Sequence, residues 1–142
     1  MALHLLKLCV GAESIEDQQE WCDRRREQRV AEGLDPRHFH VTRMVPKRID
    51  ELLDGGSLYW VIKGNIQARQ TLLDIEPFTD GDGIRRCRLF MGDEVIPTAW
   101  SPKRAFQGWR YLIDAEAPAD LTMADASVPL QLKVELAELG LL

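Results

Sequence analysis

The chain has 142 residues, of which 45% are apolar and 29% charged, and its formal net charge is −5. This apolar content excludes a generally disordered chain, and the length suits one domain with one core over residues 1–142. The negative charge disfavours indiscriminate binding to nucleic acid, because attraction to phosphate grows with positive charge.

The charge is unevenly spread along the chain. Between Arg37 and Arg110 there are 12 Lys or Arg and 9 Asp or Glu, whereas the flanks hold 6 basic and 14 acidic residues. A basic middle between acidic ends indicates either a local anion site or a domain whose ends form salt bridges with its centre.

The first part of the chain predicts a strand and then a long helix. Residues 2–10 carry apolar side chains on both faces, as in a central strand, and Gly11 ends the segment. Ser14 begins a capping-box-like segment, so we expect a helix from there to about Glu32. The arginines at 24–26 should then point in three directions, since successive helical residues are about 100° apart.

The middle of the chain predicts strands joined by tight turns. A short helix is expected over 47–54, because Pro46 suits a helix start and Gly55 a helix end. Gly64-Asn65 favours a two-residue hairpin turn, and residues 79–83 predict a second one. The expected strands are 38–45, 58–63, 66–75, 84–91, 95–100 and 106–113.

The last part of the chain leaves two interpretations open. Residues 115–126 are expected to form an exposed connector. From Val128 onward the leucines alternate as in a strand, yet they also fit helical spacing, and Pro129 and Gly140 suit a helix start and end. We prefer a C-terminal helix that packs its apolar side on the sheet.

These elements predict an α+β fold. An antiparallel sheet of six or seven short strands tends to curl, because curling removes unpaired edges. We therefore expect a small, mostly antiparallel, partly open β-barrel with an N-terminal helix, a short helix near 47–54 and a C-terminal helix.

Cysteine usage and the N-terminal segment indicate a cytoplasmic protein. The three cysteines contain no CxxC pair, which favours reduced thiols over a disulfide framework or a zinc site. The start of the chain lacks the pattern of a signal peptide, and no apolar run is long enough to span a membrane.

Cys87 is expected in the core, because Arg86 and Arg88 would point to the other face of a strand.

No metal or cofactor is expected. His38 and His40 share one face of their strand, but no third ligand follows at a recognisable spacing. Asp80 and Asp82 lack the later oxygen ligands of a calcium loop, so a hairpin turn explains them better.

Basic and aromatic residues alternate near strand ends through the middle of the chain. Guanidinium groups bind phosphates and aromatic rings stack on unpaired bases, although tryptophans in a core and arginines on a solvated face give the same pattern. The candidate nucleic-acid contacts are Lys63, Arg69, Arg104, Trp109 and Arg110.

Four segments resemble an uncharacterised bacterial family of small single-domain proteins, a domain of unknown function. They are residues 44–48, 55–70, 82–87 and 106–112. The resemblance covers nearly the whole chain, and it implies no activity and no catalytic residues.

A second, local resemblance is to PUA-like barrels, including their ASCH and EVE branches. It rests on a short helix ending in Gly56, the strand that follows, and the strand bearing Arg69. The resemblance implies a small barrel that binds RNA or modified bases. Ser57 and Trp60 stand where the ASCH pattern has Lys and Glu, which argues against an ASCH-type hydrolase.

Three functions follow as hypotheses. The first is a non-enzymatic binding module for RNA or a nucleotide, acting as a monomer or homodimer away from membranes. The second is a protein-interaction domain or homodimer without a small ligand, indicated by the acidic charge and the leucine-rich tail. The third is a hydrolase acting on a modified base or small amide, with Lys63 or Asp74 as acid or base.

Overall fold

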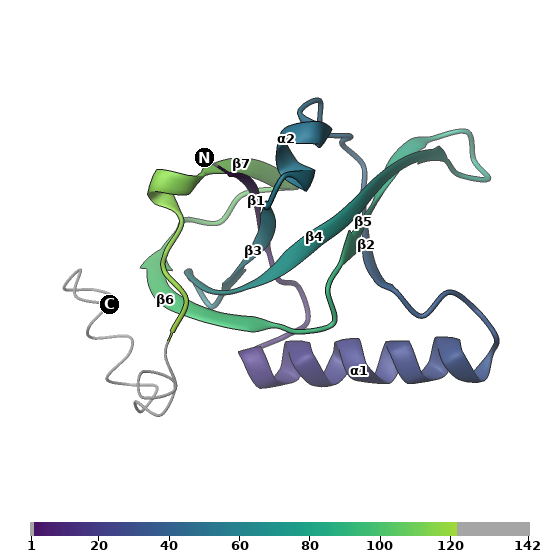
Figure 1. The fold of residues 1–142 in the computed structure, drawn as a ribbon, viewed down its shortest axis with the longest axis horizontal. Helices are drawn as coiled ribbons and strands as arrows, with labels where there is room; N and C mark the ends of the chain where they lie inside the picture. The colour runs from purple at the N-terminus through teal and green to yellow at the C-terminus, as the bar shows by residue number, and fades with distance from the viewer. Residues whose placement is uncertain (1, 122–142) are drawn as a thin grey trace.

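The computed structural model of the chain describes residues 2–121, which form an α+β structure with seven strands and two α-helices (Figure 1). In chain order the elements are β1 (Leu3–Leu8), α1 (Ile15–Ala31), β2 (His38–Thr42), α2 (Ile49–Leu53), β3 (Ser57–Ile62), β4 (Asn65–Thr79), β5 (Arg85–Met91), β6 (Ile96–Pro102) and β7 (Trp109–Ile113). The two predicted helices before residue 55 are therefore confirmed. The predicted C-terminal helix lies outside the described residues.

The strands form one mixed sheet in the order β2-β5-β4-β3-β1-β7, and β6 pairs with β4. Every pair is antiparallel except β1 with β3. Within residues 2–121 the outer strands β2 and β7 do not pair with each other, so the sheet is not closed. The α+β class and the mostly antiparallel sheet are thus confirmed, whereas the partly open barrel stays a prediction.

Strand β4 determines the shape of the sheet. Its first half pairs with β3 on one side and β6 on the other, and its second half pairs with β5. The register shifts between Leu72 and Asp74, which marks a β-bulge. An extra residue in one strand bends it and increases its twist, so one 15-residue strand serves two parts of a curved sheet. The sequence predicted the first part of this strand, over residues 66–75.

The first hairpin turn lies one residue earlier than predicted. Ile62 pairs with Asn65, so Lys63 and Gly64 form the turn, with φ of 49° and 81°. We expected Gly64-Asn65 because both residues accept positive φ. The two-residue turn instead places Lys63 in the left-handed region and keeps Asn65 in β4.

The sheet buries side chains on both of its faces. We call the face that carries Leu5, Trp60 and Leu89 the inner face, which holds the larger apolar cluster. The face that carries Leu6 and Tyr59 is the outer face, with a smaller cluster. In Figure 1, α1 runs across one end of the sheet, and α2 lies near the other. Neither of these helices is long and apolar enough to cross a membrane.

Candidate ligand-binding pocket

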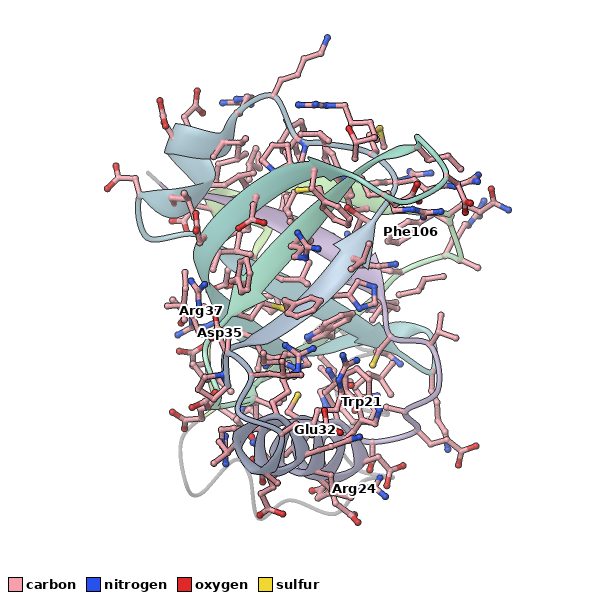
Figure 2. All side chains as sticks on the ribbon, turned by 90° about the vertical axis from the view of Figure 1, so that its right-hand side faces the viewer. Trp21, Arg24, Glu32, Asp35, Arg37 and Phe106 are labelled. Carbon is pink, nitrogen blue, oxygen red and sulfur yellow. The ribbon has the colours of Figure 1, made fainter. Side chains whose placement is uncertain are left out.

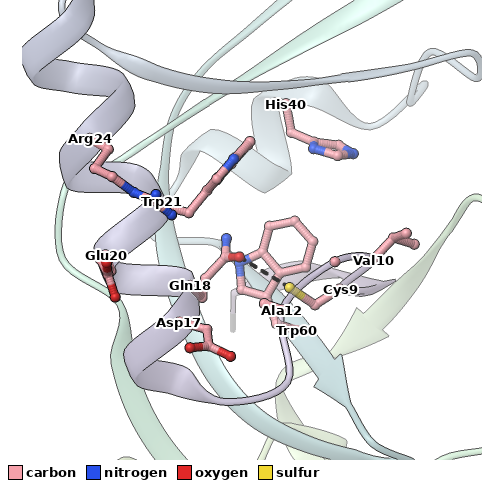
Figure 3. Close-up of a pocket in the computed structure, with 11 residues that line it drawn as sticks. Cys9, Val10, Ala12, Asp17, Gln18, Glu20, Trp21, Arg24, His40 and Trp60 are labelled. Atoms are coloured by element: carbon pink, nitrogen blue, oxygen red, sulfur yellow. Dashed lines mark hydrogen bonds between the residues drawn. The ribbon is translucent and has the colours of Figure 1, made fainter.

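A pocket of about 370 Å³ lies between α1 and the inner face of the sheet. We call it the tryptophan pocket. Trp21 projects into it from α1, while His40 and Trp60 reach it from β2 and β3 (Figure 3). The loop after β1 supplies Cys9, and Arg24 lines the helix side.

Strand alternation places the histidines at this pocket. His38 and His40 pair with Met91 and Leu89, whose side chains are buried in the inner-face cluster. Both imidazoles therefore point inward, as their shared strand face predicted. The ring of His40 packs edge-on against Trp60, with ring centroids 5.7 Å apart.

Trp21 forms part of the pocket wall on the side of α1. It lies at 36% exposure, and its ring packs edge-on against His38 at a centroid distance of 5.4 Å. The Cζ atom of Arg25 lies 4.7 Å from the centroid of the Trp21 ring. The indole is thus held on two sides while more than a third of its surface remains open.

A buried hydrogen-bond network fixes the base of the pocket. The indole Nε1 of Trp60 donates to the side-chain oxygen of Gln70 at 2.8 Å, and the Gln70 amide donates to the Gly92 carbonyl at 3.0 Å. The Gln18 amide donates to the same Gln70 oxygen at 3.5 Å, and the Cys9 thiol donates to the Gln18 oxygen at 3.1 Å. Buried polar groups satisfied in this way hold one arrangement of side chains.

Burial favours the neutral forms of the two histidines and of Cys9 at the pocket. Burial, assisted by the nearby charges of Lys7 and Arg25, lowers the pKa of His40 to about 4. Burial likewise lowers the pKa of His38 to about 4. Burial raises the pKa of the Cys9 thiol to about 11. A neutral imidazole offers one hydrogen-bond donor and one acceptor, so it can bind polar groups of a ligand without placing a charge inside the pocket.

The rim of the pocket carries both signs of charge. Asp17 and Glu20 line its edge near the start of α1, and Arg24 lines it one turn further along the helix. Among residues 2–121, no group of three His, Cys, Asp or Glu is arranged to hold a metal ion. The arrangement therefore favours binding of a planar, polar molecule with an anionic substituent on the arginine side.

Two of the predicted nucleic-acid contacts, Lys63 and Arg104, lie at one end of the sheet, and Arg110 lies in β7 opposite Leu6 of β1. Lys63 is in the β3–β4 turn, and the amide of Lys103 donates to the carbonyl of Gly64 at 2.9 Å, which brings Arg104 close to that turn. The Cζ atom of Arg110 lies 4.9 Å from the ring centroid of Phe106. The side chains of Arg104 and Arg110 are exposed, and Lys63 and Arg104 make the turn end of the sheet basic.

The other two candidates lie elsewhere. Trp109 is on the inner face at 6% exposure, and its Nε1 donates to the carbonyl of Met44 at 2.7 Å. Arg69 is on the outer face, where its guanidinium donates two 2.7 Å hydrogen bonds to Asp120 and one to Ser57 Oγ at 2.9 Å. The five candidates thus do not converge in one cleft, and whether they bind nucleic acid stays a prediction.

The outer face also holds a histidine–carboxylate pair that looks like part of a hydrolase. His4 Nε2 lies 2.9 Å from Asp114 Oδ1, but His4 Nδ1 accepts a hydrogen bond from the backbone N–H of Ser57 at 3.0 Å. The nitrogen that would act as base is therefore occupied, and the Ser57 hydroxyl instead accepts from Arg69. This geometry joins the segment after β7 to the sheet rather than activating a nucleophile.

The sequence analysis did not single out Trp21, Cys9 or Gln18. A usable signal existed for Trp21, because it is the one aromatic residue in a helix whose other residues are mostly polar. An indole on such a helix indicates contact with a partner surface or a ligand. Cys9 and Gln18 became part of the pocket only through the packing of α1 on the sheet.

Comparison with known proteins gives one match. A family model described as "Protein of unknown function (DUF1489)" matches residues 5–142. This confirms the resemblance to an uncharacterised family that the sequence indicated. No curated protein and no solved structure matches the chain, so the resemblance to PUA-like barrels stays a prediction.

Proposed function

Because the chain belongs to the DUF1489 family of proteins of unknown function, we propose a function from its own geometry: it binds a nucleotide or an unpaired RNA base in the tryptophan pocket. The observation that carries this proposal is a pocket of about 370 Å³ with two indoles and an imidazole in its walls. Such a volume falls within the range of about 300–1,000 Å³ typical of small-molecule sites.

The walls of the pocket suit a heteroaromatic base. Indole faces stack on bases, and each stacked base contributes about 1–3 kcal/mol in proteins that bind single strands. The neutral imidazole of His40 and the thiol of Cys9 supply hydrogen-bonding groups at the same place. The buried network behind Trp60 keeps its indole in position before a ligand arrives, which reduces the entropy lost on binding.

The helix side of the pocket suits a phosphate. Arg24 lines the pocket, and Arg25 lies against Trp21 at 4.7 Å. Within residues 2–121, neither side chain has a carboxylate within 4.0 Å. Guanidinium groups bind phosphate oxygens in a bidentate manner, so a nucleotide could place its base against Trp21 and its phosphate on these arginines.

The experiment that tests the proposal replaces the partly exposed indole. We expect the wild-type protein to bind a nucleoside monophosphate or a short single-stranded RNA, measured by calorimetry and by quenching of tryptophan fluorescence. Trp21→Leu should lower that affinity at least tenfold, because it removes a stacking surface, while Trp21→Phe should retain most of it.

Tyr111 supplies the matched control. It lies at 36% exposure, the same as Trp21, and belongs to β7 outside the pocket. Tyr111→Leu should therefore leave affinity for the nucleotide unchanged. The proposal fails if the wild-type protein binds none of the four ribonucleoside monophosphates and no short RNA, or if the two leucine variants lose affinity equally.

A further inference from the structure

We infer that the ligand is a single-stranded polynucleotide whose backbone leaves the tryptophan pocket along a second groove, formed by α1 with β2 and β5. We call this the arginine groove, lined by Arg25, Arg29, Phe39 and Arg88. The inference rests on the proposed function, because it assumes that the pocket takes one base of the strand. It adds the class of ligand and the direction in which the rest of the strand runs.

The arginine groove adjoins the tryptophan pocket. It has a volume of about 460 Å³ and begins at Arg25, whose Cζ atom lies 4.7 Å from the Trp21 ring centroid and 5.9 Å from that of Phe39. His38 and Phe39 are neighbours in β2, so they point to opposite faces of this edge strand. Helix α1 contacts both, and the groove therefore continues the pocket around the sheet edge. Figure 2 views this side, with Trp21 towards one end and Arg37 towards the other.

Arginine side chains lie over Phe39 of the groove and over the neighbouring Phe90. The Cζ atoms of Arg29 and Arg88 lie 4.0 Å and 5.9 Å from the ring centroid of Phe39. Arg37 lies 4.1 Å from the ring of Phe90, which is next to Phe39 in the sheet. Proteins that bind single-stranded nucleic acids combine aromatic rings with guanidinium groups, because bases stack on the rings and phosphates pair with the arginines.

Two of these arginines are available for an anion. Arg25 and Arg29 are four residues apart on α1, and within residues 2–121 neither has a carboxylate within 4.0 Å. Partial burial and the charge of Arg25 lower the pKa of Arg29. Like charges at this spacing repel each other, so a phosphate between them would relieve an unfavourable interaction.

The carboxylates of the groove are mostly engaged. Asp35 accepts hydrogen bonds from the Arg37 guanidinium at 2.7–3.2 Å, and Glu76 accepts from Arg88 at 2.8 Å. Glu32 accepts a 3.4 Å bond from the amide of Gln28, and no basic side chain within residues 2–121 forms an ion pair with it. The groove therefore keeps unpaired positive charge at Arg25 and Arg29, next to the pocket.

The route in the other direction is less favourable. It would lead from the pocket past Glu13, Glu16 and Asp17 to the basic end at Lys63 and Arg104, and the Lys63 ammonium lies 4.0 Å from a Glu13 oxygen. Phosphates would meet carboxylates at the start of α1 before they reached the lysine. We therefore place the strand in the arginine groove.

The test compares ligands of different length on matched variants. The probes are the four ribonucleoside monophosphates and a fluorescein-labelled RNA of ten nucleotides with mixed sequence. Arg25→Gln with Arg29→Gln removes two charges from the groove. Lys47→Gln with Arg85→Gln is the matched control, since both side chains are exposed and lie outside the pocket and the groove. Lys63→Gln with Arg104→Gln tests the opposite route.

We expect the groove variant to bind the RNA about tenfold more weakly and to lose clearly less affinity for the monophosphates, because a mononucleotide in the pocket reaches Arg25 but not Arg29. The slope of log K against log salt concentration should fall by about 1.4, since each phosphate contact on a single strand contributes about 0.7. The Lys47/Arg85 control should match the wild type.

Several outcomes would overturn the inference, and they differ from failure of the proposed function. If RNA binds no more tightly than a monophosphate, the arginine groove is not part of the binding site, whereas the proposal for the pocket still stands. A larger loss in the Lys63/Arg104 variant would place the strand at the opposite end, and tighter binding of duplex than of single-stranded RNA would contradict the ligand class. If RNA binding needs Arg25 and Arg29 but not Trp21, the groove binds RNA and the proposed function of the pocket is wrong.

Discussion

The side-chain oxygen of Gln70 accepts a 2.8 Å hydrogen bond from the indole Nε1 of Trp60, and Gln70 is completely buried. This contact links strand β4 to the base of the tryptophan pocket, because Gln70 also contacts Gln18 on α1. A buried amide that joins three elements should affect both the stability of the fold and the shape of the pocket.

Gln70→Leu should therefore lower both stability and ligand affinity. Leaving the buried indole N–H without an acceptor costs about 1–3 kcal/mol, which urea denaturation would measure as a lower free energy of unfolding. Gln67→Leu is the control, since Gln67 is buried, does not line the tryptophan pocket and donates to the Ile62 carbonyl at 2.8 Å. It should lose similar stability but keep affinity for nucleotide. Equal affinities in the two variants would contradict a role for Gln70 at the pocket.

Gly56 should tolerate no side chain. A Cβ atom built on it would lie 2.2 Å from the carbonyl oxygen of Leu52 and 2.3 Å from that of Leu3. Both are backbone atoms that cannot move alone, so Gly56→Ala should cost more than about 3 kcal/mol or prevent folding. Gly81→Ala is the control, because nothing lies within 4 Å of its Cβ position. Thermal unfolding would separate them, and equal melting temperatures would contradict the close packing of α2 on β1.

Local features of the fold could be read from the sequence, because turn chemistry and strand alternation act between neighbouring residues. The hairpins, the helix after Ser14 and the burial of Cys87 all follow from such rules. The parallel pairing of β1 with β3 could not, since α1, β2 and α2 all lie between them in the chain. No local pattern specifies which distant strand becomes a neighbour.

The candidate site could likewise be predicted only in part from the sequence. Strand alternation correctly placed His38 and His40 on one face, but it could not show that Trp60 and Trp21 lie beside them. The placement of Arg69 and Trp109 on opposite faces depends on the register of four strands, which pairing across the sheet decides. Sequence reasoning therefore indicated the residue types of a site but not which residues meet.

The two inward histidines should make stability depend on pH. Burial holds the pKa of His38 and of His40 at about 4, below the ordinary value of 6.5. The unfolded chain therefore binds more protons than the folded protein between pH 6.5 and 4, so stability falls as the pH is lowered through this window. Between pH 6.5 and 5 each histidine should account for about 1.5 kcal/mol of the loss.

Denaturation of the double variant His38→Gln, His40→Gln at several pH values checks this expectation. Most carboxylates stay ionised down to pH 5 in both states, so the variant should show a clearly flatter stability profile there than the wild type. A steep loss between pH 6.5 and 5 that persists in the variant would show that other groups cause it.

The ion pair between Arg69 and Asp120 should hold the segment after β7 on the sheet. The backbone around Asp120 pairs with β6, where the amide of Ala99 donates to the Ala119 carbonyl at 2.7 Å and that of Leu121 to the Pro97 carbonyl at 2.9 Å. The Arg69 hydrogen bonds lower the pKa of Asp120, so the pair persists at mildly acidic pH. Asp120→Asn should speed hydrogen exchange at Ala99 and Leu121, with a loss of global stability below about 1 kcal/mol because the pair is partly exposed.

Asp35→Asn is the matched control, since Asp35 also forms a bidentate pair, with Arg37, but precedes β2, which β5 and β4 separate from β6. It should leave exchange at Ala99 unchanged.

Asp120→Asn also frees the Arg69 guanidinium, which sequence reasoning had placed among the nucleic-acid contacts. If the strand follows the arginine groove, RNA affinity should stay unchanged in this variant. A gain in affinity would instead show that Arg69 lies on the RNA-binding surface and that Asp120 competes with phosphate for it.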